Sequence, residues 1–163
     1  MNSGPHLSCT TSAVAHTQSL AASMASVIQE GDLLVLVGDL GAGKTAFTQG
    51  LARALGVDEP VTSPTFTLAN RYEGDMAVNH LDVYRLESLA EAADLAIDEL
   101  LDDGVTLVEW GDIIRPTLPE DRLEVRIRYE DGDDDRRLDF TLVGPRWTER
   151  RDALAAALET WTS

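Results

Sequence analysis

Hydrophobic residues along the chain alternate between spacings typical of helices and continuous runs typical of buried strands. From Thr17 to Ile28 they recur every three or four positions, and Gly31-Asp32 then ends the predicted helix with a turn. The continuous run Leu33–Val37 predicts a strand buried on both faces. Helical spacing returns from Phe47 onwards, and Gly56 is a typical residue at a helix C-terminus. This order of elements favours an α/β fold.

The middle of the chain predicts a hairpin, a short helix and a further buried strand. The turn residues 73–75 separate a strand that ends at Tyr72 from a strand over residues 76–81. A short helical stretch is expected from Ser88. The apolar run that follows, residues 105–110, predicts a strand whose end carries a carboxylate.

The last third alternates with the period of two that a half-buried strand requires. Residues 122–129 and 138–142 show this alternation on either side of an acidic turn at 130–135, which predicts an antiparallel hairpin. The acidic turn lacks the residue order of a calcium loop. Thr148 is expected to cap a C-terminal helix. Together these elements predict a three-layer α/β fold with a central mixed sheet and a C-terminal antiparallel hairpin.

The length and the ends of the chain predict its organisation. At 163 residues the chain has room for one domain with a full core, which we assign to residues 10–163 with a short strand at 10–12. Residues 1–9 are expected to form a flexible leader. The single cysteine excludes an internal disulfide, and no apolar stretch is long enough to span a membrane. We therefore expect a cytoplasmic protein with no membrane contact.

The charge balance narrows the class of partner. The chain carries 29 acidic against 13 basic residues, a formal net charge of −16. Direct binding to nucleic acid needs clustered Lys and Arg that neutralise phosphates, so this composition argues against it. A well-solvated acidic surface is the plainer interpretation.

One stretch carries most of the candidate chemistry. Residues 38–45 read Gly-Asp-Leu-Gly-Ala-Gly-Lys-Thr and match the phosphate-loop pattern G-x-x-x-x-G-K-[ST] without a mismatch. Glycines let backbone N–H groups approach phosphate oxygens, Lys44 can contact the β- and γ-phosphates, and the Thr45 hydroxyl can bind Mg²⁺. The predicted strand before the loop and the helix after it agree with this interpretation. The sequence predicts a nucleoside triphosphate site.

Hydrolysis also needs a carboxylate near the metal and a group that orients water. Asp82 and Glu109 each end a predicted strand, where open parallel sheets bind their ligands. Glu109 follows the more apolar strand and is the better candidate metal ligand, whereas Asp82 suits activating water or hydrogen-bonding the water shell of the metal. Ordinary strand-end acids are the alternative. Trp110 is a candidate for lining the nucleotide pocket or a partner surface, with core packing as the alternative. His80 could touch the site, but a lone histidine in a strand is more often packed and hydrogen-bonded.

A proline flanked by hydroxyl side chains follows the predicted phosphate-loop helix. Ser63 and Thr65 on either side of Pro64 suit a loop that senses a γ-phosphate or its metal. A polar edge strand is the alternative.

Four motifs in this order resemble the bacterial TsaE (YjeE) family of tRNA threonylcarbamoyladenosine biosynthesis ATPases. They are residues 38–45, Ser63-Pro64-Thr65-Phe66, His80-Leu81-Asp82-Val83-Tyr84-Arg85-Leu86 and Val108-Glu109-Trp110, within a resemblance that spans Thr17 to Val125. The resemblance implies a weak Mg²⁺-dependent ATPase that acts with TsaD and TsaB. That machinery transfers a threonylcarbamoyl group to an adenosine beside the anticodon, so tRNA is met only indirectly, and ATP hydrolysis supports repeated turnover.

The resemblance also implies roles for individual residues. Thr45 and Glu109 match the family's Mg²⁺ ligands, Asp82 matches a residue needed for hydrolysis, and the loop around Thr65 matches a segment likened to a switch. A family member can carry an acidic nucleotide contact where this chain has Val14. The candidate catalytic residues are Lys44, Thr65 and Asp82, and the candidate cofactor-binding residues are Asp39, Gly41, Ala42, Gly43, Lys44, Thr45, Ala46 and Trp110.

Two other classes of protein remain open at this point. A small kinase of the same fold would pass the γ-phosphate to a metabolite, but such kinases usually carry an arginine-rich lid, and the arginines near residues 122–137 and 146–151 are predicted to lie on strand and helix surfaces. A nucleotide-binding switch without catalysis is the other class. The absence of an N-K-x-D motif argues against guanine recognition.

Overall fold

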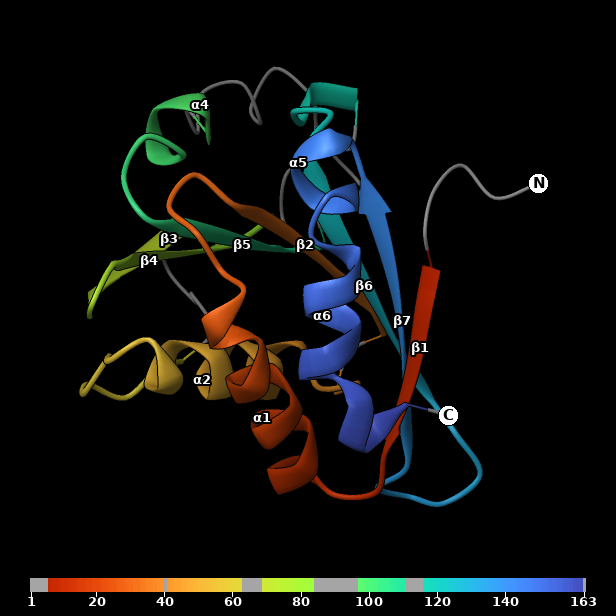
Figure 1. Cartoon of the computed structure of the whole chain (residues 1–163). Helices are drawn as coiled ribbons and strands as arrows, with labels where there is room; N and C mark the ends of the chain where they lie inside the picture. Colours follow the sequence, from red (N-terminus) through yellow and green to blue (C-terminus); the bar gives the residue numbers. More distant parts are fainter. Residues whose placement is uncertain (1–5, 40, 63–68, 84–96, 111–115, 163) are drawn as a thin grey trace.

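The computed structural model describes residues 6–39, 41–62, 69–83, 97–110 and 116–162 (Figure 1). These residues form a seven-stranded mixed sheet with the order β1-β7-β6-β2-β5-β4-β3. The predicted α/β fold with a mixed sheet is confirmed. Its strands are β1 (His6–Thr11), β2 (Leu33–Gly38), β3 (Ala69–Glu73), β4 (Ala77–Asp82), β5 (Val105–Glu109), β6 (Arg122–Tyr129) and β7 (Arg136–Val143).

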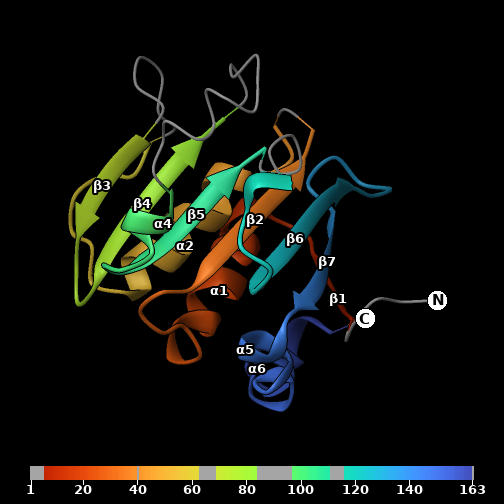
Figure 2. The same cartoon turned by 90° about the horizontal axis from the view of Figure 1, so that it is seen from above.

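Helices cover both faces of the sheet, which gives three layers. The helices α1, α2 and α6 lie on one face and α4 lies on the other, as the two views in Figures 1 and 2 show. The described helical segments are α1 (Val14–Ser23), η1 (Met24–Ser26), α2 (Lys44–Ala54), α4 (Ile97–Leu100), α5 (Pro145–Thr148), α6 (Arg151–Ala157) and η3 (Glu159–Trp161). No helix of the described residues is both long and apolar enough to cross a membrane.

Strand β2 lies at the centre and divides the core in two. Its side chains alternate, so Leu34 and Leu36 pack into the cluster under α1, α2 and α6. Leu33, Val35 and Val37 pack on the opposite face, in a smaller cluster that includes Leu100 from α4. Because β2 is parallel to both β5 and β6, it is hydrogen-bonded along both edges, as its continuous apolar run predicted.

Both predicted hairpins are present. β3 pairs antiparallel with β4 through the turn at residues 74–76, and β6 pairs antiparallel with β7 through the acidic turn. β4 is parallel to β5, so β4, β5 and β2 all end at the same edge of the sheet. The candidate site lies at this edge.

The expectation of a flexible leader over residues 1–9 is wrong for residues 6–9. They belong to β1, which runs from His6 to Thr11 and pairs antiparallel with β7. Cys9 is fully buried beside Leu138, and this burial raises the pKa of its thiol to about 11. The sequence analysis placed a short strand at residues 10–12 and did not extend it back to His6, because the pattern of residues 6–9 is short and mostly polar. Residues 1–5 lie outside the described residues.

The C-terminal helix differs from the prediction in its starting point. Thr148 does not cap it, because Thr148 is the last residue of α5, whose first turn contains Pro145. The longer helix, α6, begins at Arg151 without a side-chain cap. Trp147 in α5 is fully buried and belongs to the core cluster, so this short helix packs against the core ahead of α6. The helix predicted from Ser88 falls on residues outside the described part except for α4.

Candidate nucleotide-binding site

The phosphate loop joins the end of β2 to the start of α2. Gly41 and Gly43 have φ values of +81° and +120°, which residues with a Cβ rarely adopt. Gly43 is the N-cap of α2, so the eleven-residue helix points the positive end of its dipole at the loop. Such a helix start is a ready anion site because its first N–H groups face outwards from the helix. Gly41 and Gly43 therefore have the backbone geometry that the loop pattern predicts. Leu40 lies outside the described residues.

The side chain of Lys44 folds across this loop. Its ammonium donates hydrogen bonds to the carbonyls of Gly38, at 2.7 Å, and Asp39, at 3.0 Å. It also lies 4.0 Å from the centroid of the Trp110 ring, within the range of a cation–π contact. The Asp39 carbonyl accepts a further bond from the N–H of Ala42, at 3.0 Å. Asp39 thus takes part in the loop through its backbone.

Trp110 adopts a backbone conformation that is unusual for its type. Its φ is +64°, and it is the non-glycine residue with positive φ among those described. The Trp110 N–H nonetheless bonds the Leu36 carbonyl of β2 at 2.9 Å, so the ladder continues one residue beyond β5. Strain of this kind persists only where the surroundings hold it, and it gathers at functional sites. Here it accompanies the contact with Lys44.

The two candidate carboxylates lie side by side at the strand ends. Asp82 and Glu109 are register partners in the parallel pair β4–β5. The Thr45 hydroxyl, in the first turn of α2, donates to Glu109 Oε2 at 3.4 Å. Glu109 is 3% exposed, whereas Asp82 is partly exposed. The arrangement gives one buried acid against the helix start and one more accessible acid next to it.

His80 also reaches this cluster. It is fully buried on β4, and its Nε2 contacts the same Glu109 oxygen that accepts the bond from Thr45. The sequence had favoured an ordinary packed histidine. Its place two residues before Asp82, on the same face of a strand, is the signal that could have linked it to the site.

Arg136 on β7 also contacts the phosphate loop, in addition to the residues of β4 and β5 described above. Its Nε donates to the Ala42 carbonyl at 2.9 Å, and its guanidinium lies 4.4 Å from the centroid of the Tyr129 ring. The sequence interpretation had placed the arginines of this hairpin on a strand surface. The contact was missed because nothing in the sequence indicates that the hairpin folds back beside the loop.

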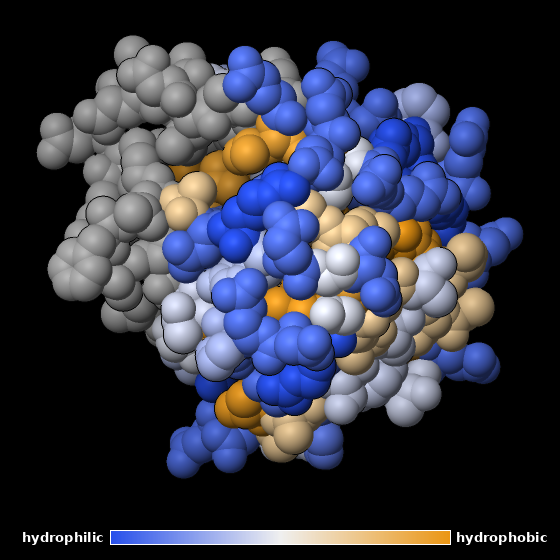
Figure 3. Space-filling view, turned by 90° about the vertical axis from the view of Figure 1, so that its left-hand side faces the viewer, coloured by the Kyte–Doolittle hydropathy of each residue, from blue (hydrophilic) through white to orange (hydrophobic). Residues whose placement is uncertain are grey.

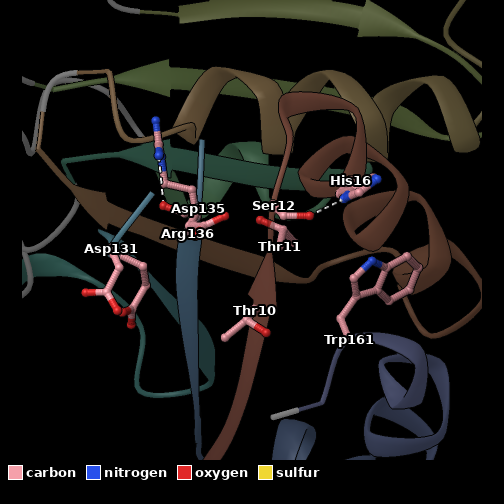
Figure 4. Close-up of a pocket in the computed structure, with 9 residues that line it drawn as sticks. Thr10, Thr11, Ser12, His16, Asp131, Asp135, Arg136 and Trp161 are labelled. Atoms are coloured by element: carbon pink, nitrogen blue, oxygen red, sulfur yellow. Dashed lines mark hydrogen bonds between the residues drawn. The ribbon is translucent and has the colours of Figure 1, made fainter. Parts of the chain in front are cut away.

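Two hollows adjoin Arg136. A small one of about 30 Å³ touches the loop itself, and its lining includes Gly41, Ala42, Gly43, Ala46, Val14, Thr17 and Asp134. A larger one of about 430 Å³ lies beyond Arg136, at the ends of β1 and β7. In Figure 4, Asp131 and Asp135 line one side of the larger hollow, and His16 and Trp161 lie on the other.

The predicted site residues fall into three groups. The structure brings together Lys44 with Trp110, and Thr45 with Glu109 and its register partner Asp82. Gly41, Ala42, Gly43 and Ala46 line the small hollow next to this cluster. Thr65 lies outside the described residues, so its candidate role stays a prediction.

The oxygen donors present fit a magnesium ion. Mg²⁺ prefers hard oxygen ligands and usually takes only one or two from the protein, with phosphate and water supplying the rest. A buried Glu109 carboxylate facing the Thr45 hydroxyl matches this habit. In the described part of the chain, no group of three or more His, Cys, Asp or Glu could hold a metal ion. The donor set therefore suits a metal that arrives with a phosphate ligand.

The glycine-rich loop joins a buried parallel strand to a helix, and its threonine faces a carboxylate at the end of a strand. These features define a P-loop nucleotide-binding protein. The family model described as "Threonylcarbamoyl adenosine biosynthesis protein TsaE" matches residues 11–138. This chain belongs to the TsaE family.

Individual relatives agree over most of their length. The tRNA threonylcarbamoyladenosine biosynthesis protein TsaE of Bacillus subtilis (strain 168) is 46% identical over 133 residues, covering 80% of this chain and 82% of that protein. The protein of the same name from Streptomyces coelicolor is 43% identical over 136 residues, covering 78% and 91%. The crystal structure of Bacillus subtilis YdiB superimposes with a TM-score of 0.79 at 37% identity, covering 96% of this chain and 98% of that one.

Proposed function

We propose that this chain is a Mg²⁺-dependent ATPase that supports turnover of a TsaD–TsaB pair in tRNA threonylcarbamoyladenosine biosynthesis. The observation that carries the proposal is the approach of Thr45, at the start of α2, to the buried carboxylate of Glu109. A phosphate loop alone serves many nucleotide proteins, but hydrolysis needs a metal-holding acid beside it. The direct test is the rate of ATP hydrolysis by this chain with and without the TsaD–TsaB pair. A rate that stays at background in both cases contradicts the proposal.

Each residue of the cluster has a distinct task in this proposal. Lys44 leaves its bonds to the loop carbonyls and places its ammonium against the β- and γ-phosphates, where Trp110 limits its position. Thr45 and Glu109 would hold Mg²⁺, which neutralises the charge that develops on the phosphates when it is bound. Asp82, more exposed than Glu109, orients and deprotonates the attacking water.

In this proposal the nucleoside part of ATP lies over the small hollow next to Arg136, because that hollow adjoins the phosphate loop. Val14 and Thr17 of α1 line this hollow opposite Asp134. Val14 is 58% exposed and carries no charge, so the acidic contact that a family member can make there is replaced by an apolar one. The larger hollow beyond Arg136 offers space for further atoms of the ligand.

Glu109→Gln and Asp82→Asn should impair different steps. Both substitutions keep the shape of the side chain and remove its charge. Loss of a charged ligand bond in Glu109→Gln should weaken Mg²⁺-dependent ATP binding by about 10- to 100-fold. Loss of the base in Asp82→Asn should lower kcat by about 10²- to 10⁴-fold with nucleotide still bound.

Calorimetry of ATP binding with and without Mg²⁺, combined with single-turnover hydrolysis, separates these two effects. Glu124→Gln is a suitable control, because this carboxylate lies on β6 and pairs with Arg122 at 2.7 Å, away from the loop. If both site variants lose only kcat, the division of roles between Glu109 and Asp82 is wrong.

The surface gives the chain little means of holding tRNA directly. The net charge is −16, and most described arginines contact a carboxylate. On the face shown in Figure 3, hydrophobic residues form small separate areas among hydrophilic ones. Counterion release from nucleic acid needs a stripe of unneutralised basic groups. The arginines in contact with carboxylates are Arg71, Arg122, Arg128, Arg137, Arg146, Arg150 and Arg151.

We therefore expect no measurable tRNA binding by the isolated chain at physiological salt, and association with TsaD–TsaB that depends on the bound nucleotide. Hydrolysis can reset a complex only if the ATP and ADP states bind the partner with different affinity. A gel-shift assay with tRNA tests the first expectation. A pull-down of the pair with a non-hydrolysable ATP analogue, ADP or no nucleotide tests the second. Direct tRNA binding, or equal capture in all three arms, contradicts this part of the proposal.

A further inference from the structure

A buried histidine holds the carboxylate that faces the start of α2. His80 lies on β4 opposite Leu107, so its side chain is the diagonal neighbour of Glu109 on the α2-facing side of the sheet. His80 is fully buried and Glu109 is 3% exposed. Solvent therefore does not compete for the contact between His80 Nε2 and Glu109 Oε2.

The contact fixes which nitrogen of the ring carries a proton. An ionised carboxylate oxygen only accepts, so with Glu109 in its charged form Nε2 is the donor of this hydrogen bond. The other ring nitrogen, Nδ1, is buried and has no hydrogen-bond partner among the described residues. An imidazole in this setting has one strong bond, and that bond is to Glu109.

We propose that His80 is a positioning residue for the magnesium site: its Nε2–H pins Glu109 Oε2 and so orients this carboxylate for Mg²⁺. A glutamate side chain has three rotatable bonds, and only the bonds it makes can restrict them. Thr45 contributes one such bond to Oε2 at 3.4 Å, but its hydroxyl is itself a candidate metal ligand. His80 is the partner that can stay in place when Thr45 turns to the metal. Hydrogen-bond partners of this kind change metal affinity by about 10- to 100-fold when they are removed.

This inference rests on the proposed function, because it assumes that Thr45 and Glu109 bind Mg²⁺ with ATP. The test uses two substitutions of His80 that place an amide nitrogen at different distances from Glu109. In His80→Gln the amide nitrogen lies near the former position of Nε2 and can still donate to Glu109. In His80→Asn the amide lies near the former position of Nδ1 and cannot reach it. Asn79→Ala is the matched control for lost stability, since Asn79 is equally buried on the same strand but bonds the carbonyls of Leu100 and Asp103.

The measurement is calorimetric affinity for ATP across a Mg²⁺ titration, without reliance on turnover. We expect His80→Asn to need about 10- to 100-fold more Mg²⁺ to reach tight ATP binding, with affinity for metal-free ATP nearly unchanged. His80→Gln should recover most of the loss, and Asn79→Ala should lower the melting temperature without changing the Mg²⁺ requirement. Equal Mg²⁺ requirements in wild type and His80→Asn overturn the inference, as does an equal loss of metal-free affinity. A wild-type chain that binds no ATP contradicts the proposed function instead.

A second measurement uses the wild-type protein, so it does not depend on whether a variant folds. Ring ¹⁵N spectra of the wild-type protein report which nitrogen of His80 is protonated. The spectrum should show the Nε2–H form, with signals that move when Mg²⁺ and ADP are added together but not with ADP alone. A ring protonated on Nδ1 only, or signals that do not respond to the metal, would contradict the inference.

Discussion

Replacing Lys44 by Ala should weaken ATP binding by at least about 100-fold while the protein stays folded. Charge-assisted hydrogen bonds are worth roughly 1.5–3 kcal/mol each, and a lysine that spans the β- and γ-phosphates makes two of them. Each 1.4 kcal/mol corresponds to about tenfold in affinity. Lys44 is also the only lysine of the chain, so no neighbouring ammonium can take its place.

Two further variants make the Lys44 measurement specific. Arg53→Ala removes a positive charge from the last turn of the same helix, at the end remote from the loop, and should leave ATP affinity unchanged. Lys44→Arg keeps the charge, but a planar guanidinium does not match the compact ammonium held between Gly38, Asp39 and Trp110. We expect it to bind ATP poorly as well. Calorimetry at matched protein concentration decides the point, and wild-type affinity in a folded Lys44→Ala protein would reject the site.

The loop and its strands could be predicted because their signals are local. The spacing from Gly38 to Thr45 prescribes its own backbone, and the run Leu33–Val37 identifies a strand covered on both faces. The position of Glu109 beside the loop could be predicted as well, because Glu109 ends an apolar strand and open parallel sheets bind their ligands at the carboxyl ends of their strands. For these residues, the short-range pattern and the final contacts point the same way.

The contacts that were missed all depend on distant parts of the chain. Arg136 reaches Ala42 only because the β6–β7 hairpin lies beside the loop, a separation of 94 residues. His6–Thr11 becomes a strand only because the edge of β7 is there to pair with it. His80 meets Glu109 only because β4 and β5 pair in parallel, although 29 residues separate the two side chains along the chain. Periodicity describes the face of an element, but it does not identify the neighbour of that face.

The largest such omission concerns arginines that had been predicted to lie on a helix surface. Arg150 is only 12% exposed in its side chain and forms two hydrogen bonds with Asp32, at 2.6 and 2.8 Å. Arg146 adds a third, at 2.9 Å, and the backbone of Gln29 a fourth, at 2.7 Å. Asp32 is fully buried and directly precedes β2. The cluster therefore ties the C-terminal helices to the strand that carries the phosphate loop.

Asp32→Ala should lower the free energy of unfolding by about 3–5 kcal/mol, because it leaves the Arg150 guanidinium buried without its counter-charge. For a chain of this size, that loss corresponds to a fall in melting temperature of roughly 6–20 °C. Asp152→Ala is the matched control: this carboxylate is fully exposed and lies 3.7 Å from Arg151, so its removal should leave the stability close to that of the wild type. Denaturant unfolding of both variants measures the difference.

The double variant Asp32→Ala/Arg150→Met then tests the cause of the loss, since removing both charges should restore part of the stability. Equal stability of Asp32→Ala and wild type, or no recovery in the double variant, would show that the cluster does not anchor the C-terminal helices to β2.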